Sequence, residues 1–285
     1  MLNVRDSIKP TSQTYKKILK AFERRYFLKK ITNICISCLI AILGITSFLY
    51  GIQLESISTI FRWMTVDGTV FTTLGAMAFI VINIVEVSKH TEMTRRIVYY
   101  IRLSSAVAES VILIVVLFSQ LPFFEEHLPI FDRYDSFVMH ILLPLLAISS
   151  FLTNDSPIGK LRPKERWHGT WFVSFYAVII LTLITAKALP TDMIPYYFLD
   201  FRHHAGASAV AFVFIYSCAY LMGWHLSEMN RKLSWLWFKG IAAKYEVFAC
   251  CKHKSTPVIC NIICPNYGGN FKYSVSTVNP RYIAY

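Results

Sequence analysis

The amino-acid sequence predicts an all-α polytopic membrane protein with six transmembrane helices and both termini in the cytoplasm. Of its 285 residues, 55% are hydrophobic and 16% are charged, whereas soluble domains carry about 25% charged residues. The apolar residues form long blocks, each close to the roughly 20 residues that a helix needs to cross the hydrocarbon. The net charge of +12 would otherwise indicate a nucleic-acid partner. The basic residues lie between the apolar blocks, however, which argues against one.

The first apolar block begins near Ile31, after a basic head over residues 1–30. The head mixes basic and apolar residues, which is typical of an amphipathic helix on an anionic membrane or of a solvated segment that only sets topology. We expect no cleavable signal peptide, because no small-residue cleavage site follows the block. Lipid tolerates no unpaired backbone groups, so each block is expected to be helical. The predicted spans, within a domain over 31–226, are 31–50, 67–86, 102–121, 136–153, 170–189 and 206–225.

Basic residues in the loops predict the orientation of the spans, since Lys and Arg accumulate on the cytoplasmic side. The head holds nine of them. The second loop, the fourth loop and the stretch 227–244 after the sixth span hold four each, with Arg102 counted at the edge of the third span. The alternate loops hold one each, namely Arg62, Arg133 and Arg202. Both termini are therefore expected in the cytoplasm, and we expect the protein in the cell membrane.

The last segment, residues 227–285, is expected to be a loosely ordered cytoplasmic tail. It holds four of the seven cysteines, and the other three lie in apolar segments, which does not resemble a secreted disulfide framework. The tail cysteines and His253 match no standard zinc spacing. Acylation is another use of cysteines next to a membrane span, in hosts that have the enzymes for it. We predict no metal site and no cofactor.

Two polar side chains lie about one turn inside apolar segments, namely Thr65 and His140. A membrane Thr commonly bonds the carbonyl four residues earlier, so Thr65 alone needs no function. An ionisable His inside a span is costly and faces a cavity or the bundle interior, although a bond to a neighbouring helix would also explain it. Both spans run inwards from the outer side. Thr65 and His140 are therefore expected at one depth, about 5 Å below the outer surface.

Further polar and aromatic residues belong to the same outer face. The fifth loop is broken by prolines and is rich in aromatic residues, which suits a membrane interface. From this face we predict a set of substrate-binding residues: Trp63, Asp67, Asp192, Tyr196, Asp200 and His204.

A threonine hydroxyl beside an imidazole supports acyl transfer. The hydroxyl attacks an ester carbonyl while the imidazole takes its proton and later returns it to the leaving alkoxide. An oxyanion donor is also required, and Tyr196, Trp63 or a backbone N–H would serve. A site at this depth suits an amphipathic ester whose acyl chain lies among membrane lipids. We therefore predict Thr65 and His140 as catalytic residues, and the sequence leaves the oligomeric state open.

Three short motifs carry a resemblance to a known family. They are Trp63-Met64-Thr65 at the opening of the second span, Met139-His140 with Pro144 at the opening of the fourth, and Pro-Tyr-Tyr-Phe-Leu-Asp over 195–200. Over roughly residues 55–235 the chain resembles the androgen-induced protein and androgen-dependent TFPI-regulating protein family with its bacterial relatives. The resemblance implies six spans and hydrolysis of fatty acid esters of hydroxy fatty acids. It also implies that Thr65 is the nucleophile and His140 the essential histidine. The residues that follow Thr65 depart from the animal pattern.

A second interpretation is non-enzymatic, namely a six-span transporter, sensor or binding protein. One variant of it is a haem protein that uses His140 with His203 or His204. The strongest support for transport is Glu109, which lies in the middle of the third span. A hydrogen bond from Glu109 to a Ser or Thr of a neighbouring helix would also explain that residue.

Overall fold

The computed structural model describes residues 12–54, 56, 60–89, 96–117, 132–154, 161–190, 193–194, 196 and 199–244. Within these ranges the chain is helical and contains no strand. Six helical segments are long and apolar enough to cross a membrane, which confirms the predicted all-α polytopic fold. They are Phe27–Leu54, Met64–Ser88, Arg96–Val115, Tyr134–Thr153, Pro163–Thr185 and Phe201–Ser234.

The first three spans are single helices. Helix α1 (Ser12–Leu54) is continuous, so the second half of the basic head runs directly into the first span. Helix α3 (Met64–Lys89) forms the second span and α4 (Arg96–Val115) the third. Helix α4 starts six residues before the predicted boundary and takes Arg102 into the span. The guanidinium is accommodated there because it donates to Ser150 Oγ at 2.7 Å and lies over the ring of Phe79.

The fourth span changes its helix type along its length. It begins with α6 (Tyr134–Phe137), widens into the π-helical turn η4 (Val138–Leu142) and continues as α7 (Leu143–Asn154). Pro144 follows this wide turn. Proline has no N–H to donate to the carbonyl of His140, and its ring crowds that carbonyl, so the backbone does not keep α-helical geometry here.

The fifth span is also composite, with α8 (Pro163–Arg166), the 3-10 turn η5 (Trp167–Thr170) and α9 (Trp171–Thr185). It starts and ends earlier than predicted, which places Lys187 in the segment that follows α9. Helix α10 (Phe201–Lys244) forms the sixth span and extends well beyond it. The predicted tail is therefore helical up to Lys244, and its cysteines lie outside the described residues.

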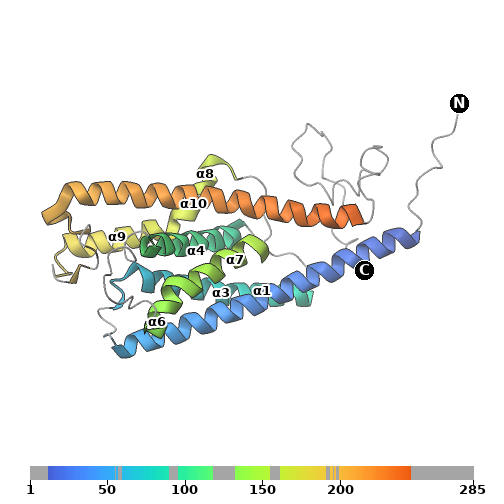
Figure 1. The fold of residues 1–285 in the computed structure, drawn as a ribbon, viewed down its shortest axis with the longest axis horizontal. Coiled ribbons are helices and arrows are strands. Elements are labelled where there is room, and N and C mark those ends of the chain that lie inside the picture. Colours follow the sequence, from blue (N-terminus) through green and yellow to red (C-terminus); the bar gives the residue numbers. More distant parts are fainter. Residues whose placement is uncertain are drawn as a thin grey trace.

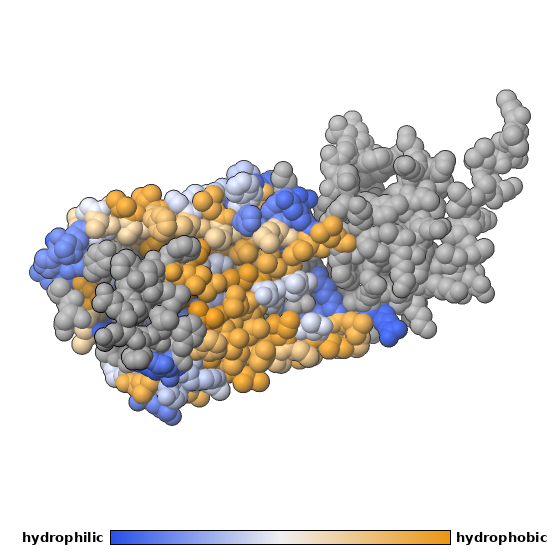
Figure 2. Space-filling view, viewed as in Figure 1, coloured by the Kyte–Doolittle hydropathy of each residue, from blue (hydrophilic) through white to orange (hydrophobic). Residues whose placement is uncertain are grey.

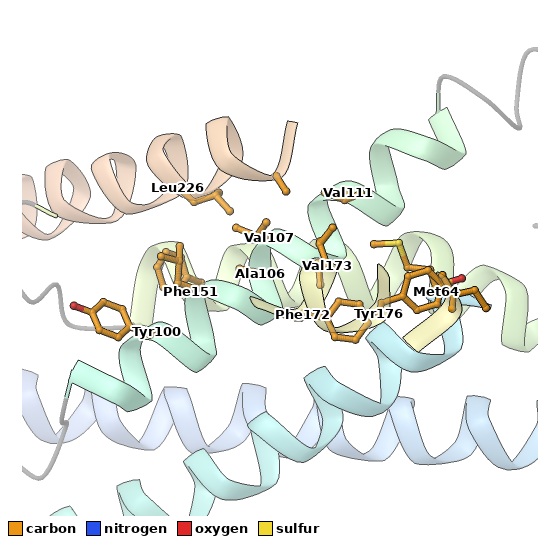
Figure 3. Packing of buried hydrophobic residues seen from close by; sticks show 14 of the residues in the cluster. Met64, Tyr100, Ala106, Val107, Val111, Phe151, Phe172, Val173, Tyr176 and Leu226 are labelled. Carbon is orange, nitrogen blue, oxygen red and sulfur yellow. The ribbon is translucent and has the colours of Figure 1, made fainter. Parts of the chain in front are cut away.

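Helix α4 is the central element of the bundle. It packs against α3, α7, α9 and α10, whereas α1 packs on α3 and α7 (Figure 1). The side chains Val107 and Val111 of α4 meet Phe151 of α7, Val173 of α9 and Leu226 of α10 in the main core (Figure 3). Lipid is as apolar as these side chains, so close packing holds such helices together.

Helix α10 approaches the fifth span through two glycines. A Cβ on Gly169 would lie 3.2 Å from the Cα of Gly223, and a Cβ on Gly223 would lie 3.3 Å from the carbonyl oxygen of Arg166. Small residues at such a contact let two helices approach backbone to backbone. This contact lies near the middle of α10, which is otherwise the least buried of the six spans.

The flank of the bundle is apolar and exposed. Figure 2 shows hydrophobic residues along the length of the helices, with hydrophilic residues gathered towards the ends. Large apolar side chains with more than half of their surface exposed include Ile42, Val81, Phe175, Val178 and Val213. A bilayer covers such a surface. The start of α1 and the end of α10 lie at the same end of the bundle (Figure 1), as an even number of spans requires.

Candidate functional site

Thr65 lies in the first turn of α3. The helix begins at Met64, and the carbonyl of Trp63 accepts the N–H groups of Val66 and Asp67 at 3.1 and 3.2 Å. Thr65 is buried, with 8% of its surface exposed. Its hydroxyl does not bond a backbone carbonyl of the preceding turn, as the hydroxyl of a membrane Thr usually does. Instead, Thr65 Oγ1 lies 3.4 Å from Nε2 of His140.

His140 occupies the middle of the π-helical turn. The N–H of Leu143 bonds the carbonyl of Val138, five residues earlier, as in a π-turn. The loosened turn allows the side chain of His140 to bond its own helix, and Nδ1 lies 2.8 Å from the carbonyl oxygen of Ser136. Turns of this kind are frequent at functional sites.

The bond to Ser136 determines which ring nitrogen of His140 carries the proton. A carbonyl oxygen only accepts hydrogen bonds, so Nδ1 must donate. In the neutral imidazole, Nε2 is then the unprotonated nitrogen, and it faces the hydroxyl of Thr65. This is the tautomer that a general base for Thr65 requires. The distance of 3.4 Å is long, as catalytic contacts often are before substrate binds.

Tyr196 lies on another side of Thr65, in the segment between α9 and α10. Burial raises the pKa of its phenol to about 12, although a hydrogen bond with the Thr65 side chain acts to lower this pKa. The Asp67 carboxylate also raises this pKa, whereas the backbone of Met64 lowers it. The ring packs edge-on against Trp63, with centroids 5.8 Å apart. Tyr196 therefore stays protonated at neutral pH and is available as a donor beside Thr65.

An apolar pocket ends at Thr65 and Tyr196. Its volume is about 40 Å³, and most of its walls come from α4, α9 and α10. The lining includes Ile112, Ile180 and Phe212. His140 is not part of the lining, so the imidazole approaches Thr65 from outside the pocket. The hydroxyl of Thr65 thus lies between a base on one side and an apolar chamber on the other.

Only some of the other predicted substrate-binding residues lie close to Thr65. Trp63 packs on Tyr196. The guanidinium carbon of Arg62 lies over the Trp63 ring, 5.0 Å from the ring centroid. Asp67 is half-buried one turn along α3 and acts on Tyr196 only through its charge. Asp192 lies outside the described residues.

Asp200 and His204 lie at the start of α10 and do not line the pocket. Asp200 accepts a hydrogen bond from Nδ1 of His203 at 2.6 Å, and this bond lowers the pKa of its carboxyl group. Arg202 Nε lies 3.6 Å from the other oxygen of Asp200. The backbone of His204 is kinked, with φ −132° and ψ 44°. These residues shape the start of α10 and are not brought to Thr65.

Two contributors to the site were absent from the prediction. One is the carbonyl of Ser136, and the signal for it was Pro144, four residues after His140. The other is Tyr176 of α9, which lines the pocket and donates to the carbonyl of Arg62 at 2.9 Å. Nothing in the sequence singles out Tyr176, because its place follows from the packing of α9 on α3.

The described residues contain no group of three or more His, Cys, Asp or Glu side chains that could hold a metal ion. No protein-family model, curated protein or solved structure matches the chain. The arrangement at Thr65 therefore has to be interpreted from its own geometry.

Proposed function

We propose that the protein is an integral membrane hydrolase of lipid esters, with Thr65 as nucleophile and His140 as general base. One observation carries the proposal. The unprotonated Nε2 of His140 faces Thr65 Oγ1 at 3.4 Å, while Nδ1 is anchored on the carbonyl of Ser136. Nucleophile, base and a group that orients the base together form the arrangement typical of covalent acyl transfer.

The reaction has two halves. Thr65 Oγ1 attacks the ester carbonyl carbon, and its proton passes to Nε2 of His140. The tetrahedral intermediate collapses when the imidazolium gives that proton to the leaving alkoxide, which departs as the alcohol and leaves an ester on Thr65. Water then attacks this ester and gives a proton to His140, and collapse returns the proton to Thr65 and releases the carboxylic acid. The carbonyl of Ser136 stabilises the imidazolium formed in each half.

Two donors support the intermediate's oxyanion. The first is the phenol of Tyr196, which lies beside the Thr65 side chain and remains protonated because burial raises its pKa to about 12. The second is the N-terminus of α3, where the N–H groups of Val66 and Asp67 already donate to Trp63, while those of Met64 and Thr65 come too early in the helix for an acceptor inside it. The positive end of the helix dipole also lies here. Developing negative charge next to Thr65 is therefore favoured.

The pocket argues for an acyl chain as the substrate group next to Thr65. Its walls are apolar, and it lies between helices whose outer surface faces lipid. At about 40 Å³ it accommodates little of a long chain, so side chains must separate to admit one. Those of α10 are the most free to do so, because this helix is the least buried span. Fatty acid esters of hydroxy fatty acids fit this description and are the substrate class that the resemblance implies.

The orientation predicted from the loop charges supports a site near the outer face of the membrane. The ends of α1 and α10 that carry the basic segments would lie in the cytoplasm, and Thr65 lies at the opposite end of the bundle. The ester would reach the site from the bilayer, with its acyl chain still in the hydrocarbon. We propose the cell membrane as the location.

Ester turnover by the purified protein tests the proposal. The substrate is a fatty acid ester of a hydroxy fatty acid in mixed micelles. Thr65→Ala is expected to reduce turnover to the background rate. The matched control is Thr182→Ala, because the hydroxyl of Thr182 bonds the carbonyl of Val178 in its own helix at 2.6 Å and lies outside the site. Wild-type turnover retained by Thr65→Ala would refute the proposal.

A further inference from the structure

The carboxyl group of Glu109 is buried in the middle of the bundle without a partner. Glu109 belongs to α4, the central helix, and none of its surface is exposed. Neither of its carboxylate oxygens has a hydrogen-bond partner. A polar group buried in an apolar medium is costly unless it is satisfied, and a charged one far more so. Ionisable side chains inside a membrane usually mark a site for an ion or a substrate.

The neighbours of Glu109 come from the antiparallel helix α3. A Cβ on Gly68 would lie 2.7 Å from Cδ1 of Ile112, and a Cβ on Gly75 would lie 3.3 Å from Oγ of Ser105. These two contacts bracket the level of Glu109. There the side chain of Thr72 is its polar neighbour, although the two do not form a well-placed hydrogen bond.

The threonines of α3 at this level differ from most others in the spans. Thr46, Thr153 and Thr182 each donate to the carbonyl four residues earlier, which is the ordinary state of a membrane Thr. The buried hydroxyls of Thr69 and Thr72 make no such bond. Their oxygens are therefore available to a ligand. Thr72 adjoins the Glu109 carboxylate, which also has no partner, and Thr69 lies three residues before Thr72 on the same helix.

A third threonine on α3 is excluded from this group. The hydroxyl of Thr73 also has no partner, but it points towards α1. A Cβ on Gly44 of that helix would lie 1.9 Å from Thr73 Oγ1. Thr73 therefore belongs to the contact between α1 and α3.

No basic side chain in the described part of the chain pairs with Glu109. Arg102, on the same helix, lies about two turns deeper and is bonded to Ser150. Lys30 forms its ion pair with Glu86 at the inner end of α3. The charge of a Glu109 carboxylate is therefore not balanced by the protein.

We propose that Glu109 and Thr72, with Thr69 one turn above them, form an intramembrane site for a small monovalent cation of the size of sodium. Carboxylate and hydroxyl oxygens are hard ligands, which suit hard cations. One carboxylate balances one positive charge, whereas the second charge of a divalent ion would remain uncompensated at this depth. The ion would satisfy both the charge and the unpartnered oxygens, with water completing its coordination. This site is separate from ester hydrolysis, and its test does not depend on turnover.

The melting temperature of the purified protein in detergent tests the site. Wild type is compared in sodium, potassium and choline chloride at equal ionic strength and about pH 8. A ligand that binds only the folded state raises the melting temperature, by about 5 °C when it is well above its dissociation constant. We expect a saturable rise in sodium and little or none in choline.

Three variants locate the effect. Glu109→Gln keeps the shape of the side chain but removes its charge, and Thr72→Val removes only a hydroxyl, so both are expected to abolish or strongly reduce the sodium response. The matched control is Ser110→Ala, which is expected to keep the response because Ser110 already bonds the carbonyl of Ala106 at 2.7 Å. A wild-type melting temperature that is equal in sodium and choline would overturn the proposal, whether or not the variants fold. An unchanged sodium response in Glu109→Gln would overturn it as well.

Discussion

His140 reaches Thr65 through a turn of helix that is wound more loosely than an α-helix. Nε2 of His140 lies 3.4 Å from Thr65 Oγ1, and the π-helical turn Val138–Leu142 holds the ring there by presenting the carbonyl of Ser136 to Nδ1. The imidazole is thus positioned by the backbone of its own helix. A carboxylate plays that part in the familiar serine triad.

The first prediction concerns the base itself. His140→Gln removes the nitrogen that accepts the Thr65 proton, and kcat is expected to fall about 10²- to 10⁴-fold, the usual contribution of a general base. The variant should remain folded, since the imidazole makes one bond to its own helix and one to Thr65. Steady-state kinetics on purified protein measure the effect. A kcat within threefold of wild type would show that His140 is not the base.

The second prediction concerns the loose turn. Pro144→Ala supplies an N–H that can bond the carbonyl of His140 and draw the backbone back towards an α-helix. The ring would then turn away from Thr65, and a displacement of about 1 Å is enough to cost about 10²-fold in kcat. Pro190→Ala, in the outer loop, serves as the control. Full activity in Pro144→Ala would mean that the π-turn does not position His140.

The third prediction concerns the oxyanion. Tyr196→Phe removes the phenol hydroxyl but keeps the ring that packs on Trp63. We expect kcat to fall about 10²- to 10³-fold with little change in KM, because the donor acts on charge that develops in the transition state. An equal rise in KM at unchanged kcat would instead assign Tyr196 to ground-state binding.

The fourth prediction is a pH dependence from the same residue. In the unfolded chain a Tyr releases its proton near pH 10, whereas burial raises the pKa of Tyr196 in the folded protein to about 12. Between these values the folded state binds more protons than the unfolded state, so its stability falls as pH rises. We expect this alkaline loss of melting temperature in wild type and a smaller loss in Tyr196→Phe. Identical pH profiles for the two proteins would contradict the assignment.

The six spans could be predicted because their length, their apolar composition and the charges of the loops are all contained in short stretches of sequence. The common depth of Thr65 and His140 also followed from the topology. Their contact did not, because it requires α3 to pack beside η4, and no local pattern specifies which spans touch. Arg102 was placed at a boundary because a charge normally ends a span. Its partners, Ser150 and the ring of Phe79, come from two other helices and could not be foreseen.

A fifth prediction follows from the buried ion pair between α1 and α3. Lys30 and Glu86 bond each other where the first span begins and the second span ends, and both side chains are almost completely buried. Lys30→Met leaves the Glu86 charge uncompensated and is expected to destabilise the protein by about 3–5 kcal/mol. Replacing both residues, as Lys30→Met with Glu86→Leu, should recover at least half of that loss. A double variant no more stable than Lys30→Met in thermal unfolding would show that the cost does not come from an unpaired charge.

Covalent labelling shows whether Thr65 is a nucleophile that His140 activates. A fluorophosphonate reacts with a hydroxyl nucleophile that a base has activated, and mass spectrometry of the labelled protein identifies the modified residue. We expect a single adduct on Thr65 that is lost in His140→Gln and retained in Thr182→Ala. A protein that hydrolyses lipid esters but carries its adduct on another residue would contradict the account, as would labelling that Thr65→Ala leaves unchanged.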